Sequence, residues 1–452
     1  MKILVTGGTG FIGAALVKKL CQKGHEVVIL TRNSFSAYSN IPVYCEVREW
    51  DPGKYLCPSV FHGVDAVINL AGENIADGWW TKKRKFKISN SRTLAIKTLK
   101  NSIELLTVKP KAFISASAIG YFGESGEKIT DEDTNPGEGF LAQVCQNWEY
   151  EIFKINRLGV RTIALRIGLV LGRDGGALKK MLSPFRMGLG GKLGKGKQWI
   201  SWIHIEDLVN MFIHTIENNS MNGVYNAVAP NPVTNSTFTK TLGKVLNKPT
   251  FLSIPTFALK FILGELSDLL LTSQRVTSNK IHNHSFHFQY PKLEEALENI
   301  SSNFDHEFQM EQWVPHPPKK AFDFFKEARN LEKITPDFLN FKVLNQSTAN
   351  IEEGTKINYR FTLHGIPMWW QSKIIDWKPP FKFSDYQVHG PYSKWLHTHE
   401  FEEVNGGTLM RDRVVYRLPL GIPGDAIAEP LVKKDIRKIF SHRRKVIESL
   451  ME

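Results

Sequence analysis

Short apolar runs alternate with longer amphipathic segments in the first two thirds of the chain. Continuous apolar runs occupy residues 2–6, 27–30, 64–70, 112–115 and 162–167. After the first run, apolar residues recur at helical spacing at Ile12, Leu16, Val17 and Leu20. A strand that is apolar throughout is buried on both faces, which is typical of a parallel sheet with helices on both sides. The pattern therefore predicts an α/β domain built on a doubly wound parallel sheet.

A different pattern begins near residue 300. A strand-like segment at 307–314 and a helical stretch at 319–328 come first, and a long amphipathic segment at 426–451 closes the chain. Between them lie extended segments rich in aromatic and β-branched residues, at 341–348, 355–363, 369–377, 381–388, 395–403 and 408–418. This order predicts an α+β domain whose antiparallel sheet wraps around one long helix. We place the two domains at residues 1–300 and 305–452.

The most apolar stretch, residues 255–271, is interrupted by Lys260, Glu265 and Asp268. We therefore predict one or two buried amphipathic helices there and no membrane span. The first residues run straight from a strand into a glycine-rich loop. A cleavable signal would destroy that loop, so we expect a cytoplasmic protein.

The formal net charge is +13, which suits an anionic cofactor or substrate. The densest basic run is Lys82–Lys85, with Lys87, Arg92 and Lys97 beyond it, and no recognisable nucleic-acid-binding motif accompanies it. We interpret the run as a solvated helix face and predict no nucleic-acid partner. The cysteines lack the paired spacing of a zinc site or a disulfide framework. We expect buried free thiols at Cys21, Cys45, Cys57 and Cys145.

A glycine motif lies between the first strand and the first helix, with Gly7, Gly10 and Gly13 in the pattern of a dinucleotide-binding loop. Gly7 permits a tight turn, Gly10 lets the backbone approach a pyrophosphate, and Gly13 lets the helix pack close to the strand. The helix N-terminus then offers free N–H groups to the phosphates. The motif predicts a nicotinamide dinucleotide site whose first contacts come from Thr6, Gly7, Gly10, Phe11, Ile12 and Gly13.

The end of the second strand distinguishes NADP from NAD. A site for NAD carries Asp or Glu there, to bind the ribose 2′-hydroxyl. This chain has Thr31 and Arg32 instead, and the guanidinium of Arg32 can pair with a 2′-phosphate. We therefore expect NADP rather than NAD, with an exposed Arg32 of no special role as the alternative.

Three segments resemble the extended short-chain dehydrogenase/reductase superfamily: TGGTGFIG at 6–13, Asn69-Leu70-Ala71-Gly72, and SASAIGYFG at 115–123. Further segments narrow the resemblance to an atypical branch, the NAD-dependent epimerase/dehydratase-like "epimerase family proteins". They lie at 69–85, 139–149, 165–182, 188–208, 223–235 and 273–276. The resemblance covers residues 1 to about 298. It implies a Rossmann-type fold with a small substrate-side part at its end.

The resemblance also implies roles for individual residues. Asn69, Leu70, Ala71 and Gly72 would lie along the cofactor. Ser117 occupies the place of the superfamily's Ser/Thr, which hydrogen-bonds the reacting oxygen, and Tyr121 follows four residues later. The segment 202–207, with His204, matches the part that closes the substrate side.

The superfamily's Tyr-x-x-x-Lys pair is missing. Aligned by Glu149, Leu141 stands in place of the tyrosine and Cys145 in place of the lysine. Neither side chain can exchange a proton with the assistance of an ammonium group. Tyr121, Glu124, Glu149 and His204 are alternative acid/base groups, although Tyr121, Glu149 and His204 also have ordinary structural explanations. Lys195 and Lys197, in a glycine-rich run, could steer an anionic substrate or simply be solvated.

Residues 305–452 resemble the SRPBCC, START-like or polyketide-cyclase/dehydrase superfamily, whose fold is the helix-grip. The segments that carry this resemblance are 314–336, 354–402 and 408–421. It implies an elongated apolar cavity and a hydrophobic ligand. Six aromatic residues could line that cavity or fill the core outright, namely Trp369, Trp370, Trp377, Tyr386, Tyr392 and Trp395.

His397 and His399 flank Thr398 and therefore point to one face of a strand. A metal site needs a further carboxylate or histidine nearby, and the sequence gives no reason to assert one. We predict no metal site.

Two functions remain open. The first is an NADP-linked oxidoreductase or epimerase that acts on a small carbonyl or hydroxyl compound, while the second domain holds an apolar ligand. The second is a non-catalytic sensor of NADP(H) and a lipid-like ligand, which the missing Tyr/Lys pair favours.

Overall fold

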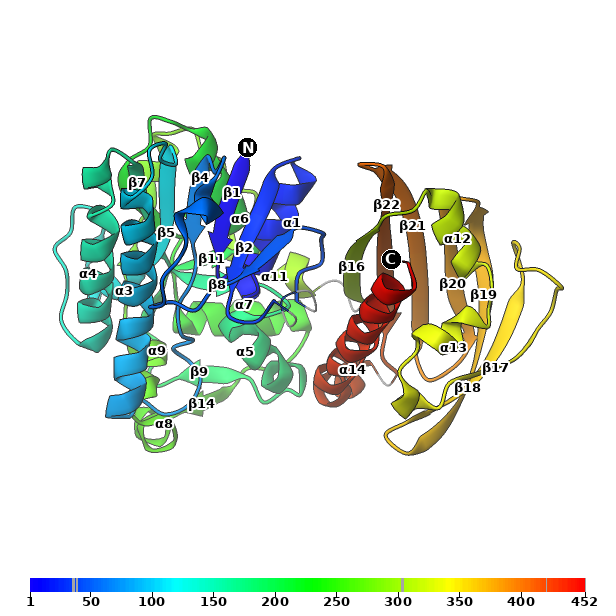
Figure 1. Cartoon of the computed structure of the whole chain (residues 1–452). Helices are drawn as coiled ribbons and strands as arrows, with labels where there is room; N and C mark the ends of the chain where they lie inside the picture. Colours follow the sequence, from blue (N-terminus) through cyan, green and yellow to red (C-terminus); the bar gives the residue numbers. More distant parts are fainter. Residues whose placement is uncertain (35–36, 38–39, 302–304, 420, 452) are drawn as a thin grey trace. The chain divides into compact units, whose positions relative to one another are not determined.

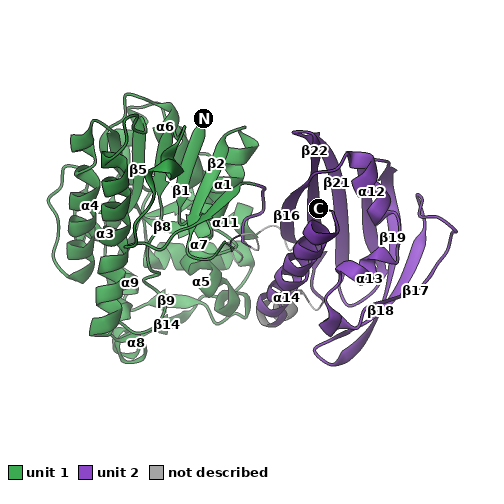
Figure 2. Cartoon of the chain, viewed as in Figure 1, with its two compact units in different colours: residues 1–34, 45–302 green, residues 35–44, 303–452 purple. Residues whose placement is uncertain are grey.

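The structure is a computed structural model (Figure 1). It describes residues 1–34, 37, 40–301, 305–419 and 421–451, with only the backbone at 421–427. The chain divides into two compact units, coloured separately in Figure 2. Unit 1 comprises residues 1–34 and 45–302, and unit 2 comprises residues 35–44 and 303–452. Among the described helices, none combines the length and the apolar character needed to cross a membrane.

Unit 1 is built on a seven-stranded sheet in the order β12-β7-β5-β4-β1-β2-β3, with parallel pairing throughout. Its strands are β1 (Lys2–Thr6), β2 (Glu26–Thr31), β3 (Glu46–Glu49), β4 (Ala66–Asn69), β5 (Ala112–Ala118), β7 (Arg161–Ile167) and β12 (Gly223–Ala227). The central strands are buried along almost their whole length, as their continuous apolar sequences require. The predicted doubly wound parallel sheet is confirmed.

Helices cover both faces of this sheet. On one face α3 (Lys82–Glu104) packs on α4 (Phe140–Phe153), and on the other α1 (Phe11–Gln22) packs on α6 (Ile205–Glu217). α1 buries Leu16, Val17 and Leu20, the stripe that its sequence spacing predicts. Further α-helices of unit 1 are α5 (Gly176–Arg186), α7 (Asn235–Leu246), α8 (Thr256–Leu263), α9 (Asp268–Leu271), α10 (Asn279–His282) and α11 (Leu293–Ser301).

Short two-stranded sheets lie at the carboxyl edge of the large sheet. They are formed by β6 (Ile129–Thr130) with β15 (Arg275–Val276), β8 (Leu169–Leu171) with β11 (Trp202–His204), β9 (Gly191–Leu193) with β14 (Leu252–Ile254), and β10 (Trp199–Ile200) with β13 (Val233–Thr234). Three of these pairs link segments that follow different strands of the large sheet, whereas β8 and β11 both follow β7. Together they assemble the surroundings of the site described below.

Residues 255–271 differ from the prediction of buried helices. They form two short helices, α8 and α9, but Phe257 and Phe261 are 77% and 85% exposed, and Leu259 is the buried residue of α8. A helix of eight residues presents only about two turns, so one side chain per turn can reach the core. The cysteines also differ in part, because Cys57 is exposed while Cys45 and Cys145 are buried free thiols.

Unit 2 is an antiparallel sheet in the order β16-β22-β21-β20-β19-β18-β17 with one long helix, α14 (Gly421–Leu450), against it. Its strands are β16 (His306–Val314), β17 (Lys342–Gln346), β18 (Lys356–Leu363), β19 (Ile366–Lys378), β20 (Lys382–His389), β21 (Lys394–Val404) and β22 (Gly407–Arg417). Two short helices, α12 (Pro318–Phe325) and α13 (Asn330–Ile334), follow β16. The predicted helix-grip architecture is confirmed.

The core of unit 2 lies between the sheet and its helices. Phe322 of α12 contacts Phe383 and Phe401 on the sheet, and Phe440 of α14 contacts Phe308. The six aromatic residues singled out from the sequence divide into two groups. Four pack against this core, namely Trp370, Trp377, Tyr392 and Trp395, whereas Trp369 and Tyr386 are exposed.

Candidate active site

The glycine loop forms a tight cradle between β1 and α1. Gly7 has φ +70°, and a Cβ there would lie 2.6 Å from the backbone carbonyl of Leu70, at the end of β4. A Cβ on Gly13 would lie 2.2 Å from the Gly7 oxygen. α1 begins at Phe11 with Gly10 as N-cap, and no side chain caps it. The helix N-terminus is thus available to an anionic group, as the pyrophosphate of a dinucleotide requires.

Buried hydroxyl and amide groups connect the ends of three strands beneath this cradle. The Thr6 hydroxyl donates to Asn69 Oδ1 at 2.7 Å, and Asn69 Nδ2 donates to Ser115 Oγ at 3.0 Å. All three side chains are fully buried. Thr6 and Asn69 therefore hold β1, β4 and β5 in place, while Leu70, Ala71 and Gly72 continue toward the surface.

The end of β2 carries no acidic residue of its own, and Thr31 is half-buried while Arg32 is exposed. Glu49 of β3 stands opposite Thr31 and accepts from Ser34 N at 3.0 Å, and Glu73, which follows β4, lies in the field of Arg32. Arg84 Nη1 donates to Glu73 Oε1 at 2.6 Å, and this bond, with smaller contributions from Arg32 and Lys87, lowers the pKa of Glu73. Arg84 thus pairs with Glu73, and Arg32 remains exposed. Together with the glycine cradle and the open N-terminus of α1, the residues present fit a nicotinamide dinucleotide.

Ser117 ends the buried part of β5 in a network with two charged residues. Its hydroxyl donates to Glu149 Oε1 at 2.7 Å. Arg166 Nε and Nη2 donate to the two oxygens of Glu149, each at 2.9 Å. Tyr121 lies in the 3-10 helix Ile119–Phe122, with its ring centroid 3.4 Å from the guanidinium carbon of Arg166. The network joins β5, α4 and β7.

Leu141 and Cys145, at the positions of the superfamily's tyrosine and lysine, lie one turn apart on α4. Burial, reinforced by the negative charge of Glu149, raises the pKa of the Cys145 thiol to about 12. Cys145 is therefore a neutral thiol at physiological pH and supplies neither an ammonium group nor a thiolate.

A cavity of about 770 Å³ opens at the carboxyl edge of the sheet. Its walls include Ala118–Gly120 at the end of β5, Ile167–Leu169 at the end of β7, and both Leu141 and Cys145. In doubly wound sheets, ligands bind at this edge. The superfamily's catalytic positions thus face a cavity of the size expected for a small molecule.

The other residues selected from the sequence occupy different surroundings. His204 is buried, caps the N-terminus of α6 by accepting from Glu206 N at 3.2 Å, and stacks on Tyr290. Lys195 is exposed on the loop between β9 and β10. Glu124 lines the cavity and accepts backbone hydrogen bonds from Gly126 and Ser273. His204, Lys195, Ser117 and Tyr121 are not among the residues that line the cavity.

Arg92 is a cavity residue that the sequence did not single out. It was counted with the basic run on a solvated helix face, yet its guanidinium lies 5.0 Å from the Trp148 ring, inside the cavity wall. A Cβ on Gly72 would lie 3.4 Å from its Cζ, so Arg92 also contacts the cofactor segment. Its position four residues after Ile88, on the apolar stripe of α3, was the available signal.

Comparison with known families divides the chain into three parts. The model of the "NAD dependent epimerase/dehydratase family" matches residues 3–227, and a "domain of unknown function (DUF1731)" matches residues 254–300. The "polyketide cyclase / dehydrase and lipid transport" family matches residues 314–440. The third match covers most of unit 2.

Several relatives resemble the first two thirds of the chain. The chloroplastic epimerase family protein SDR39U1 homolog of Arabidopsis thaliana is 38% identical over 66% of this chain and 86% of its own length. Epimerase family protein YfhF of Bacillus subtilis is 38% identical over 66% and 98%. The human epimerase family protein SDR39U1, solved with NADPH, is 34% identical over 67% and 100%, with a TM-score of 0.59. The chain therefore belongs to the NAD-dependent epimerase/dehydratase family, as an epimerase family protein followed by a polyketide-cyclase/lipid-transport domain.

Proposed function

We propose that unit 1 binds NADP(H) and uses it as an oxidoreductase or epimerase on a small carbonyl or hydroxyl compound in the 770 Å³ cavity. The observation that carries the proposal is the position of Arg92. This one guanidinium lies against Gly72 of the cofactor segment and also lines the cavity, so cofactor and substrate would lie on either side of it. The nicotinamide, when bound, supplies or accepts a hydride.

The preference for NADP(H) rests on Arg32. Its guanidinium would pair with the 2′-phosphate, which a hydroxyl in NAD cannot replace. The NADPH in the human relative's structure supports this choice, although a UDP-glucose 4-epimerase of Thermus thermophilus with the same fold was solved with NAD. Gly7, Gly10 and Gly13 would receive the pyrophosphate at the N-terminus of α1.

A calorimetric titration with NADPH and NADH tests the cofactor site. We expect Arg32→Ala to weaken NADPH binding about tenfold or more, since a charged hydrogen bond contributes about 1.5–3 kcal/mol, and to leave NADH binding unchanged. Arg157→Ala is the matched control, because Arg157 is an exposed arginine in the 3-10 helix Asn156–Leu158. This helix precedes β7, which lies on the other side of the sheet's centre from β2 and Arg32. Equal losses for both cofactors in Arg32→Ala would contradict the assignment.

For the reaction we propose roles for Ser117 and Tyr121, which flank the cavity-lining residues Ala118–Gly120 without lining the cavity themselves. The Glu149–Arg166 pair holds both in place, through a hydrogen bond to Ser117 and through the guanidinium face on Tyr121. Arg92 would bind an acidic group of the substrate at the cavity wall, and the exposed Lys195 would attract it. NADPH oxidation with a panel of small carbonyl compounds should fall in Ser117→Ala and Tyr121→Phe. Turnover that survives both variants would remove these roles.

The second candidate is a non-catalytic sensor of NADP(H). The neutral Cys145 and apolar Leu141 in the cavity wall favour it, because neither exchanges protons at neutral pH. Deuterium transfer separates the two functions. Label carried from deuterated NADPH into a product establishes catalysis, whereas intact NADPH binding without transfer to any member of the panel establishes the sensor. In either case we propose that unit 2 binds a hydrophobic ligand, as its family match suggests.

A further inference from the structure

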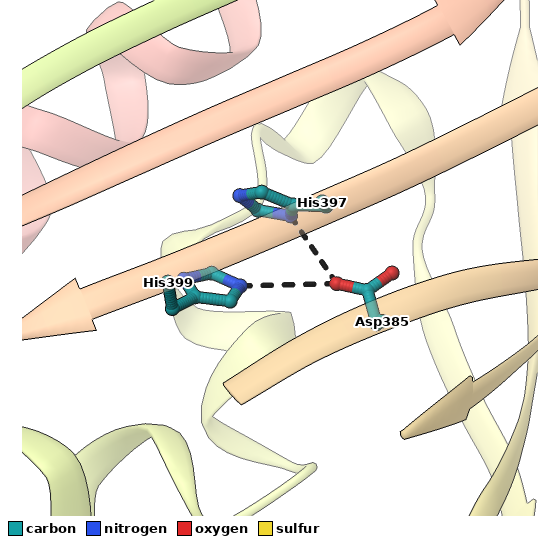
Figure 3. A group of neighbouring side chains, drawn as sticks. All are labelled: Asp385, His397 and His399. Atoms are coloured by element: carbon teal, nitrogen blue, oxygen red, sulfur yellow. Dashed lines mark ion pairs between the residues drawn. The ribbon is translucent and has the colours of Figure 1, made fainter. Parts of the chain in front are cut away.

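A buried cluster of two histidines and two aspartates spans three adjacent strands of unit 2. His397 and His399 point from β21 to the same face, toward the helices. Sheet register places Asp385 of β20 opposite His397, and Asp412 of β22 opposite His399. Figure 3 shows the two imidazoles converging on one carboxylate oxygen of Asp385. The four side chains are between 5% and 19% exposed.

The two carboxylates contact the imidazoles at different distances. Asp412 Oδ1 lies 3.0 Å from His397 Nε2 and 2.8 Å from His399 Nδ1, which are hydrogen-bond lengths. Asp385 Oδ2 lies farther away, at 3.3 Å from His397 Nδ1 and 3.8 Å from His399 Nε2. Each imidazole therefore places one ring nitrogen at hydrogen-bond distance from Asp412 and turns its other nitrogen toward Asp385.

We propose that Asp385, His397 and His399 bind one divalent first-row transition-metal ion. With metal–ligand bonds of about 2.0–2.2 Å, tetrahedral ligand atoms lie about 3.4 Å apart, close to the separations observed on the Asp385 side. The three candidate ligand atoms all lie within 4.8 Å of one another. Two imidazoles and one carboxylate suit Zn²⁺ or Fe²⁺ rather than Mg²⁺ or Ca²⁺.

Asp412 and Arg443 complete the surroundings of this site. Metal-binding histidines usually donate their second N–H to a carboxylate, which fixes the tautomer and the ring orientation, and Asp412 is placed to accept from both rings. Arg443 of α14 is buried, with Nη2 3.8 Å from Asp412 Oδ1, and so balances one of the two carboxylates. A cation bound between Asp385 and the two imidazoles would balance the charge of this second carboxylate.

One coordination position would stay open on the side of Asp385. This carboxylate is the most exposed member of the cluster, at 19%, whereas aromatic rings cover the imidazoles, with Phe383 and Phe325 over His399 and Phe440 over His397. A three-ligand site with an open position is the arrangement of metal sites that bind water or a substrate. The inference concerns unit 2 alone and does not depend on the function proposed for unit 1.

From the sequence we expected no metal site, because the pair of histidines lacked a nearby acidic partner. Asp385 lies 12 residues before His397, across a turn, and strand pairing rather than sequence spacing brings it into reach. That expectation considered neighbours along the chain and not neighbours across the sheet.

The test is a Co²⁺ titration of the tag-free full chain after treatment with a chelator. We expect one Co²⁺ per chain, visible by its d–d absorption, displaced by one equivalent of Zn²⁺. His399→Ala and Asp385→Asn should abolish stoichiometric binding, and Asp412→Asn should weaken it about 10–100-fold. His364→Ala is the matched control, because His364 forms an exposed 2.8 Å pair with Asp435 in the same unit.

X-ray absorption of the Zn²⁺-loaded wild type tests the site without any substitution, so it remains informative if a ligand variant fails to fold. It should detect two imidazole ligands. Either of two outcomes would overturn the proposal. In the first, the wild type binds no metal in a stoichiometric amount. In the second, His397→Ala and His399→Ala both still bind the metal as the wild type does. The cluster would then be an ion-pair network in which a proton on an imidazole balances the second carboxylate.

Discussion

Glu149 and Arg166 form a two-pronged ion pair inside unit 1, with both N–O distances at 2.9 Å and both side chains less than 10% exposed. The pair joins helix α4 to strand β7 and fixes Ser117 and Tyr121 on either side. A buried pair of this kind stabilises little relative to an apolar replacement, but removal of one partner leaves an uncompensated charge.

We therefore expect Glu149→Gln to lower the local free energy of unfolding by about 3–5 kcal/mol. Hydrogen exchange of amides in β5 and β7 measures the effect. Glu217→Gln is the control, because Glu217 forms an exposed 2.7 Å pair with Lys23 whose loss should cost less than about 1 kcal/mol. Similar exchange rates in the two variants would mean that the Arg166 charge is already solvated.

Substitution of two glycines in the cofactor loop should affect stability and NADPH binding differently. A Cβ on Gly13 would lie 2.2 Å from the Gly7 oxygen, so Gly13→Ala should lower the melting temperature and abolish NADPH binding. A Cβ on Gly10 would lie 3.4 Å from that same oxygen, a contact that the fold tolerates. Gly10→Ala should therefore melt near the wild type while binding NADPH more weakly, because the Cβ obstructs the pyrophosphate. Thermal melts measure the stability of both variants, and calorimetry measures their affinity for NADPH. An NADPH affinity in Gly10→Ala equal to that of the wild type would contradict the placement of the pyrophosphate at Gly10.

The sequence predicted those features in which local pattern and tertiary structure agree. Continuous apolar runs predicted the strands of the parallel sheet, and the glycine spacing predicted the turn into α1. Features that depend on pairing across elements were missed. Arg166 and Glu149 lie on a strand and a helix 17 residues apart, and no periodicity links them. The apolar segment 255–271 was placed in the core because its composition is apolar, although most of α8 faces outward.

Acid should destabilise unit 1 through His204. Burial lowers the pKa of His204 to about 4, below its usual 6.5. Between these values the unfolded chain binds a proton that the folded chain does not, so stability is complete above about pH 6.5 and is lost as the pH falls toward 4. The shift corresponds to at most about 3 kcal/mol. His204→Asn keeps a good N-cap for α6 and should flatten the pH dependence of the melting temperature in this range. An unaltered pH profile in that variant would assign the acid sensitivity to other groups.

The thiols of Cys57 and Cys145 should differ sharply in reactivity. Cys57 is exposed, and a hydrogen bond with Ser59 lowers its pKa, so it should react with iodoacetamide in the native protein. Cys145 is buried with a pKa near 12 and should be modified only after unfolding. Mass spectrometry of peptides after timed alkylation measures both rates, and Ser59→Ala should slow the reaction of Cys57 alone. Rapid native labelling of Cys145 would show that a thiolate forms in the cavity, which would make Cys145 a candidate nucleophile or base and weaken the case for a sensor.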